Sequence, residues 1–206
     1  MKKTLLIILA IVVLLVLFTV GKYNAIVKYD ESVKTAWSQV ENVYQRRLDL
    51  IPNLVNTVKG AAAQESGVLI AVVNARANAT KVNIDINDAK SFAQFQQAQG
   101  EVSSSLSKLL AVVENYPTLQ SIQAFRDLMT QLEGTENRIT VERKNFNDAV
   151  NTLNIYIRSF PANIVAAIFG FEKAQQFEAN AWANVAPTVD FNAPTAPAQP
   201  TPTVTQ

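Results

Sequence analysis

Charged residues interrupt rows of otherwise apolar residues, and three of them are the first candidates for chemistry: Arg47, Glu136 and Arg143. One interpretation is a buried polar layer that fixes the register of packed helices at some cost in stability. In that layer Arg47 would pair with Glu136. Arg143 would pair with a side chain near Gln39. The alternative is a proton or ligand site inside the protein, and we favour the polar layer.

The composition excludes most enzyme chemistry, because the 206 residues include no histidine and no cysteine. Ser-His-Asp and Cys-His nucleophiles, imidazole acid–base catalysis and Cys/His ligation of zinc or haem all need these residues. Ferritin-like di-iron sites need Glu-x-x-His pairs and are excluded in that form. With 18 Lys and Arg against 17 Asp and Glu, the net charge of +1 gives no field to attract nucleic acid. We expect no cofactor, no metal ion and no nucleic-acid partner.

The charged residues must be positioned by helices, because apolar residues recur at alternating steps of three and four. Three such rows are present. The first row includes Ile26, Val33, Trp37, Val40, Tyr44, Arg47, Ile51, Leu54 and Val58. The second includes Phe92, Phe95, Gln99, Val102, Leu106, Leu109 and Val113, and the third includes Phe125, Leu132, Glu136, Ile139, Arg143, Phe146, Val150, Leu153 and Ile157. The sequence therefore predicts an all-α protein.

Helix lengths predict an elongated antiparallel four-helix bundle with a short C-terminal helix. A break near Gly60 lets the last long helix fold back along the first, and in that register Arg47 faces residue 135, next to Glu136. Against the break, the first row continues to Ala79. We favour the break. Asn87 or Asp88 is expected to cap the helix that follows.

Pro52 lies inside the first predicted helix and should free the carbonyl of Leu48. Asn53 or a water molecule is a candidate donor to that carbonyl. The alternative is functional, since a kink with Arg46 and Asp49 beside it would present a surface to a partner. The candidate partner surface therefore consists of Arg46, Asp49, Pro52 and Asn53.

Residues 4–21 carry no charge and span roughly 27 Å as a helix, which is enough to cross the core of a bilayer. A cleaved signal peptide is the alternative, but residues 19–21 fit a cleavage site poorly. We expect a retained single-pass anchor in the cell membrane. Lysines flank both ends, so the positive-inside rule assigns no side to the bundle.

The sequence predicts a short apolar helix and an extended tail in the C-terminal region. Phe169, Phe171, Phe177 and Trp182 make it aromatic, and we expect the helix to cap the bundle, with contact to the lipid interface as the alternative. Residues 187–206 are rich in Pro, Thr and Ala and should form an extended tail. The expected domains are an anchor at 1–21, a bundle at 22–186 and the tail at 187–206.

Several blocks of residues follow one another in a characteristic order. They are Tyr23-Asn24, Glu31, Trp37-Ser38-Gln39-Val40, residues 44–55, Val58-Lys59-Gly60, residues 136–139, Arg143, Phe146-Asn147, Asn154, residues 158–163, Phe169-Gly170-Phe171 and Phe177-Glu178-Ala179. In this order they resemble the LemA family, over roughly residues 22–191. The resemblance implies a bacterial single-pass membrane protein with a helical bundle, no cofactor and no accepted catalytic residues. It also implies a membrane or envelope partner, for which a membrane zinc metalloprotease is one candidate.

Three functions remain open at this point. We favour a non-catalytic, membrane-anchored scaffold or interaction protein. A membrane-remodelling or lipid-interface protein that acts through its aromatic C-terminal segment is the second. The third is a hydrolase or transferase that uses carboxylates, Lys and Ser, and tight packing of the row charges with no pocket beside them would eliminate it.

Overall fold

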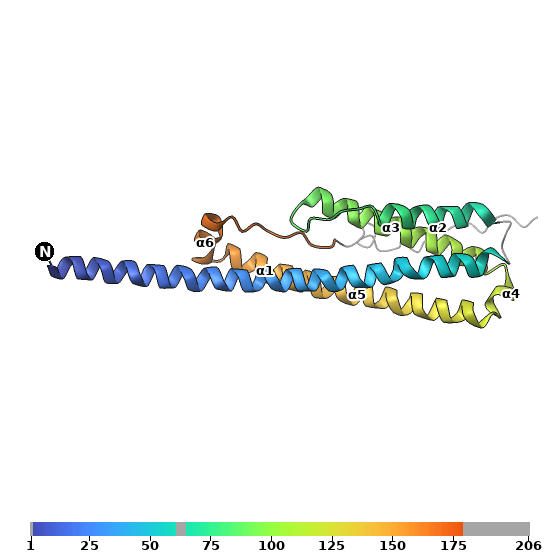
Figure 1. Cartoon of the computed structure of the whole chain (residues 1–206), viewed down its shortest axis with the longest axis horizontal. Coiled ribbons are helices and arrows are strands. Elements are labelled where there is room, and N and C mark those ends of the chain that lie inside the picture. Colours follow the sequence, from blue (N-terminus) through green and yellow to red (C-terminus); the bar gives the residue numbers. More distant parts are fainter. Residues whose placement is uncertain (1, 61–64, 179–206) are drawn as a thin grey trace, which may run out of the picture.

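The computed structural model describes residues 2–60 and 65–178, and all regular structure in that part of the chain is helical. Six helices follow one another in the described residues, and Figure 1 shows their arrangement. They are α1 (Lys2–Lys59), α2 (Ser66–Ala79), α3 (Ala89–Val113), α4 (Pro117–Gln120), α5 (Gln123–Arg158) and α6 (Ala162–Phe169). The predicted all-helical bundle is confirmed. Residues 179–206, which include the predicted tail, lie outside the described residues.

Helix α1 combines the predicted anchor with the first helix of the bundle and runs without a break from Lys2 to Lys59. Its N-terminal part projects beyond the other helices in Figure 1. A window of 18 residues there is apolar enough to cross a membrane, and none of it is buried. Burial begins at Ile26 and then recurs along one face as far as Val58.

Helices α1 and α5 lie side by side and antiparallel, and they form the main pair of the fold (Figure 1). Their register is close to the predicted one. Ring centroids of Trp37 and Phe146 are 5.2 Å apart, and Arg47 Nη1 lies 3.1 Å from Glu136 Oε2. The rows of apolar residues on the two helices therefore face each other along most of the length of α5.

The predicted break near Gly60 is present, because α1 ends at Lys59 and α2 begins at Ser66. Helix α2 packs against α3 and α1 in the half of the bundle far from the anchor. The alternative of one helix continuing to Ala79 is wrong. Asp88 caps α3, where its carboxylate accepts hydrogen bonds from the backbone N–H groups of Lys90 and Ser91.

Pro52 does free the carbonyl of Leu48, and a side chain other than Asn53 donates to it. Arg76 of α2 donates from Nε to Leu48 O over 2.9 Å. A carbonyl left without a partner inside the bundle would cost stability, and the guanidinium removes that cost. The proline therefore creates a docking point for α2.

An aromatic cluster fills the half of the bundle nearer the anchor. Trp37 is at its centre and lies within 6.1 Å, centroid to centroid, of four phenylalanine rings. These rings belong to Phe92, Phe95, Phe146 and Phe177. The first two come from α3, the third from α5 and the last from the segment after α6, so with Trp37 of α1 the cluster joins four parts of the chain.

Residues 171–178, which we call the strap, leave α6 and run back along the bundle (Figure 1). Gly170 ends α6 at a φ of 74°, which glycine adopts without strain. Two asparagines of α5 then hold the strap by its backbone. Asn154 exchanges two hydrogen bonds of 3.0 and 3.1 Å with Ala174, and Asn147 exchanges two of 3.0 and 2.8 Å with Phe177.

Candidate functional site

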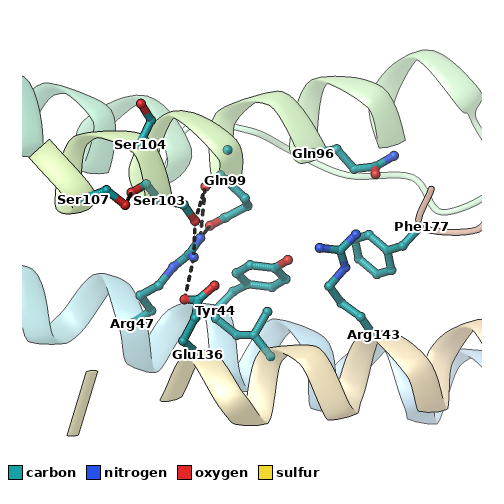
Figure 2. Close-up of a pocket in the computed structure, with 12 residues that line it drawn as sticks. Tyr44, Arg47, Gln96, Gln99, Ser103, Ser104, Ser107, Glu136, Arg143 and Phe177 are labelled. Carbon is teal, nitrogen blue, oxygen red and sulfur yellow. Dashed lines mark hydrogen bonds and ion pairs between the residues drawn. The ribbon is translucent and has the colours of Figure 1, made fainter. Parts of the chain in front are cut away.

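A polar groove of about 610 Å³ opens between α3 and α5, and we call it the α3–α5 groove. Figure 2 shows α3 along one side, with α1 and α5 along the other. Its lining combines arginine, glutamine and serine side chains with an apolar floor. The lining residues are Tyr44, Arg47, Gln96, Gln99, Gly100, Ser103, Ser104, Ser107, Glu136, Ile139, Arg143 and Phe177.

Arg47 is the most deeply buried charge of the groove, with only 1% of its side chain exposed. Its Nη2 donates to Gln99 Oε1 over 2.6 Å and to Gln99 O over 3.2 Å. Its Nη1 donates to Ser103 Oγ over 2.8 Å and to Glu136 Oε2 over 3.1 Å. Arg47 therefore ties α1 to α3 and α5 at one level of the bundle, as Figure 2 shows.

The structure brings Arg47 and Glu136 together, but the two side chains differ greatly in burial. The Glu136 side chain is 52% exposed, so its charge is largely screened by water. Gln99, which is buried, supplies the shortest contact. Sequence reasoning did not assign Gln99 to the site, although its position within the second apolar row was a usable signal. Arg47 Nε is buried and has no hydrogen-bond partner among the described residues.

Arg143 does not join this layer through a side chain near Gln39, and that expectation was wrong. Gln39 lies on the exposed side of α1. Arg143 instead donates from Nη2 to the backbone oxygen of Glu178 over 3.3 Å, and its guanidinium lies 4.5 Å from the ring centroid of Phe177. The strap therefore supplies the partners of Arg143, and Arg143 lies at one end of the groove.

Tyr44 forms part of the groove wall beneath both arginines. The guanidinium of Arg47 lies 5.0 Å from the centre of the Tyr44 ring. Burial raises the pKa of the Tyr44 hydroxyl above its ordinary value of 10.0, and the charges of Arg143 and Arg47 partly oppose this. Tyr44 is therefore neutral at physiological pH and acts as an apolar wall with one polar end.

The lining of the groove is better suited to hydrogen bonding than to catalysis. Three predicted row charges do lie beside a pocket, so packing alone does not eliminate an enzyme. Among the described residues of the lining, however, Glu136 is the one carboxylate, and paired acid–base chemistry needs a second. Ser103 Oγ donates a hydrogen bond to the carbonyl of Gln99 and accepts one from Arg47, and neither group is a base that could deprotonate the hydroxyl. In the described residues no group of three or more acidic side chains could hold a metal ion.

Comparison with known proteins identifies the family. The family model described as the LemA family matches residues 36–191, which is most of the bundle. The chain belongs to the LemA family. The resemblance that the sequence blocks indicated is therefore confirmed.

Relatives from two bacteria are similar to this LemA-family chain. The magnetosome protein MamQ 2 of Paramagnetospirillum magneticum is 31% identical over 179 residues, covering 76% of this chain and 65% of the relative. The magnetosome protein MamQ of Magnetospirillum gryphiswaldense is 28% identical over 175 residues, covering 76% and 64%. The chain thus spans a little under two thirds of the length of these relatives.

The predicted partner surface lies on α1 of this LemA-family bundle. Arg46, Asp49 and Asn53 are exposed, whereas Pro52 is half-buried. Asp49 accepts a hydrogen bond from Gln45 over 2.8 Å, along the same helix. These residues are accessible, and they lie outside the lining of the α3–α5 groove.

The predicted lipid-interface residues separate into two groups. Phe177 is buried in the aromatic cluster, so its assignment to the lipid interface was wrong; the strap places its ring against Trp37 and Phe92. Phe169 and Phe171 stay near the anchor, with their rings 4.8 and 5.7 Å from that of Tyr23. Trp182 lies outside the described residues.

An apolar surface surrounds α6 in the LemA-family fold. Phe160 is 81% exposed and Ile168 is 69% exposed, and Ile164 and Phe169 are about half exposed. The opposite face of α6 packs on the bundle through Ala162, Val165 and Ala166. Because Phe169 contacts Tyr23, this surface lies beside the point where the apolar segment of α1 ends.

Proposed function

We propose that the protein is a non-enzymatic interaction module anchored in the cell membrane by residues 4–21. The observation that carries this proposal is the continuity of α1, which passes from an unburied apolar segment into the core of the bundle. A helix that is continuous through both parts holds the bundle in a fixed relation to the bilayer. The relatives named as magnetosome proteins support a role at a membrane surface.

The groove is the proposed binding surface, and its ligand is an extended stretch of polypeptide from a membrane or envelope protein. Amide and hydroxyl side chains can pair with the N–H and C=O groups of an extended backbone, as Asn147 and Asn154 already do for the strap. Gln96, Ser104 and Ser107 line the groove with the same chemistry. A membrane metalloprotease is one candidate partner.

Photocrosslinking in intact membranes tests this proposal. A photoreactive residue at Ser104 samples the groove, and one at Asn53 samples the exposed side of α1. The matched control is Val73, which is exposed on α2. We expect one membrane or envelope protein to be captured from Ser104 and not from Val73. Equal capture from Ser104 and Val73, or no capture from Ser104, would contradict a binding role for the groove.

A second candidate function is supported by the apolar surface of α6. We propose that this surface rests in the lipid interface, since a surface of this kind beside a membrane span is suited to lie at the headgroup level. The chain lacks cysteine, so a polarity-sensitive dye can be attached at Ile168→Cys in the full chain. In liposomes we expect a blue-shifted emission relative to the dye at exposed Lys144→Cys. Identical spectra at the two positions would exclude lipid contact by α6.

A further inference from the structure

We propose that Arg143 binds a carboxylate of the extended polypeptide in the α3–α5 groove. The ligand is then a segment with one acidic group at the Arg143 end and uncharged polar residues beyond it. This inference rests on the proposed function of the groove as a site for extended polypeptide, and it names the chemistry that the ligand must carry. The carboxylate can belong to an Asp or Glu side chain or to the free end of a chain.

The charges that line the groove are not balanced within the lining. Tyr44 stays neutral at physiological pH, and Arg47 forms an ion pair of 3.1 Å with Glu136. Arg143 is the remaining charged residue of the lining. It forms no ion pair with any carboxylate of residues 2–60 and 65–178. The nearby Glu142 accepts a hydrogen bond from Asn145 and is not part of the lining. The uncompensated positive charge of the groove therefore belongs to Arg143, and it favours an anionic ligand.

The strap holds the Arg143 guanidinium in place. The guanidinium lies 4.5 Å from the ring centroid of Phe177, which is buried and is held by Asn147 through two hydrogen bonds. Its one protein acceptor among the described residues is the backbone oxygen of Glu178, at 3.3 Å from Nη2. A guanidinium carries five N–H donors and binds a carboxylate through two of them. Because contact with an aromatic ring restricts its orientation, less entropy is lost when a carboxylate binds.

The next level of the groove gives no net attraction to a second acid. Glu136 lies seven residues before Arg143 on α5, which is about 10 Å along the helix and about the length of three extended residues. The Arg47–Glu136 pair at that level is neutral as a unit. Ser103 and Ser107 lie toward the far end of the groove in Figure 2. A ligand is thus expected to place its acid at Arg143 and its uncharged polar groups along the serines.

Fluorine NMR of the full chain in detergent tests the inference. The sequence contains no cysteine, so a trifluoromethyl label can be attached at Gly100→Cys in the groove, where an added Cβ meets no atom within 4 Å. The probes are blocked peptides of alternating Ser and Ala with a central Glu or a central Gln. A third probe is the Gln peptide with a free C-terminal carboxylate. The shift of the label with peptide concentration gives each dissociation constant.

We expect the Glu peptide to bind about tenfold more tightly than the blocked Gln peptide. Arg143→Gln should abolish this preference, and the strap should stay in place because Asn147 and Asn154 hold it independently. The matched control is Arg138→Gln, which removes the same charge from an exposed position of α5 outside the lining and should keep the preference. If the free-ended peptide binds more tightly than the Glu peptide, the carboxylate is that of a chain end; the reverse order assigns it to a side chain.

A fourth peptide, with a second Glu three residues from the first, tests the role of Glu136. It should bind no more tightly than the single-Glu peptide to the unmodified groove, but about tenfold more tightly to Glu136→Gln, in which Arg47 is left to attract the second acid.

Equal binding of the Glu and blocked Gln peptides, or no shift of the label with any peptide, would overturn the inference. A preference that survives Arg143→Gln would also overturn it. Photocrosslinking from Ser104 does not depend on a carboxylate. Capture there, together with equal binding of the two peptides, would therefore remove this inference and leave the proposed function of the groove intact.

Discussion

Arg47 depends on Gln99 more than on Glu136, because Gln99 is buried and makes the shortest hydrogen bond. Gln99→Leu removes an acceptor from a buried guanidinium and should lower the free energy of unfolding by about 3 kcal/mol. Glu136→Gln removes a partner that is half exposed and should cost about 0–1 kcal/mol. Thermal unfolding of the full chain in detergent, followed by circular dichroism, distinguishes the two. A larger loss for Glu136→Gln would contradict this ranking.

Tyr44 should make the bundle sensitive to alkaline pH. Its folded-state pKa is raised by burial, so the unfolded chain loses the hydroxyl proton at a lower pH than the folded chain does. The contribution of the protonated Tyr44 hydroxyl to stability is therefore complete below about pH 10 and is lost as the pH rises through its folded-state pKa. We expect the stability of Tyr44→Phe, measured by urea unfolding, to fall less steeply above pH 10. Parallel pH profiles for the two proteins would contradict this assignment.

At the scale of single residues, the sequence shows which charges are unusual but not what each one contacts. Arg47 and Glu136 were predictable because they interrupt apolar rows that face each other. The partner of Arg143 was not, because it is the backbone oxygen of Glu178. A backbone acceptor leaves no side-chain signature in a sequence.

Among the elements, the contact of α2 with α1 depends on Pro52. Arg76→Met leaves Leu48 O without a donor and should cost about 1–3 kcal/mol. In the Pro52→Ala background, the N–H of residue 52 can itself bond Leu48 O, as in an ordinary helix. We therefore expect Arg76→Met to cost markedly less there, in a double-mutant cycle measured by thermal unfolding. Additive effects would show that Arg76 does not replace the missing helical bond.

The strap is held by side chains of α5, and Asn147 is the residue whose loss should release it. Asn147→Ala removes two hydrogen bonds to Phe177. We expect hydrogen exchange at residues 174–178 to accelerate about tenfold, while the centre of α5 stays protected. The matched control is Asn151→Ala, exposed on the same helix between the two asparagines. An equal effect of both substitutions would mean that the asparagine bonds do not hold the strap.

The helices were predictable from the period of their apolar residues, and so was the break near Gly60. The strap was not, because a short extended segment has no helical period and its backbone partners are asparagines on a distant helix. For this reason Phe177 was assigned to the lipid interface, although it lies in the core. Likewise, no local pattern near Pro52 indicates Arg76, which is 28 residues from Leu48 along the chain.

On the scale of the whole molecule, the antiparallel register follows from the lengths and rows of α1 and α5. The polar groove does not, because its opening depends on how far α3 stands from α5, and sequence periodicity reports only which face of a helix is buried. The same geometry gives the molecule two distinct regions. An apolar end, with residues 4–21 and α6, suits lipid, and the groove lies farther along the bundle.

The central claim is that a single rigid helix both crosses the bilayer and forms the core of the bundle. Spin labels at Ala10→Cys, within the apolar segment, and Ser38→Cys, within the bundle, are both exposed on α1 and measure this in liposomes without interference from native cysteine. At 1.5 Å per residue, the backbone positions should be about 42 Å apart with a narrow distribution. A broad distribution, or a clearly shorter distance, would mean that α1 bends at the membrane surface and would contradict the account.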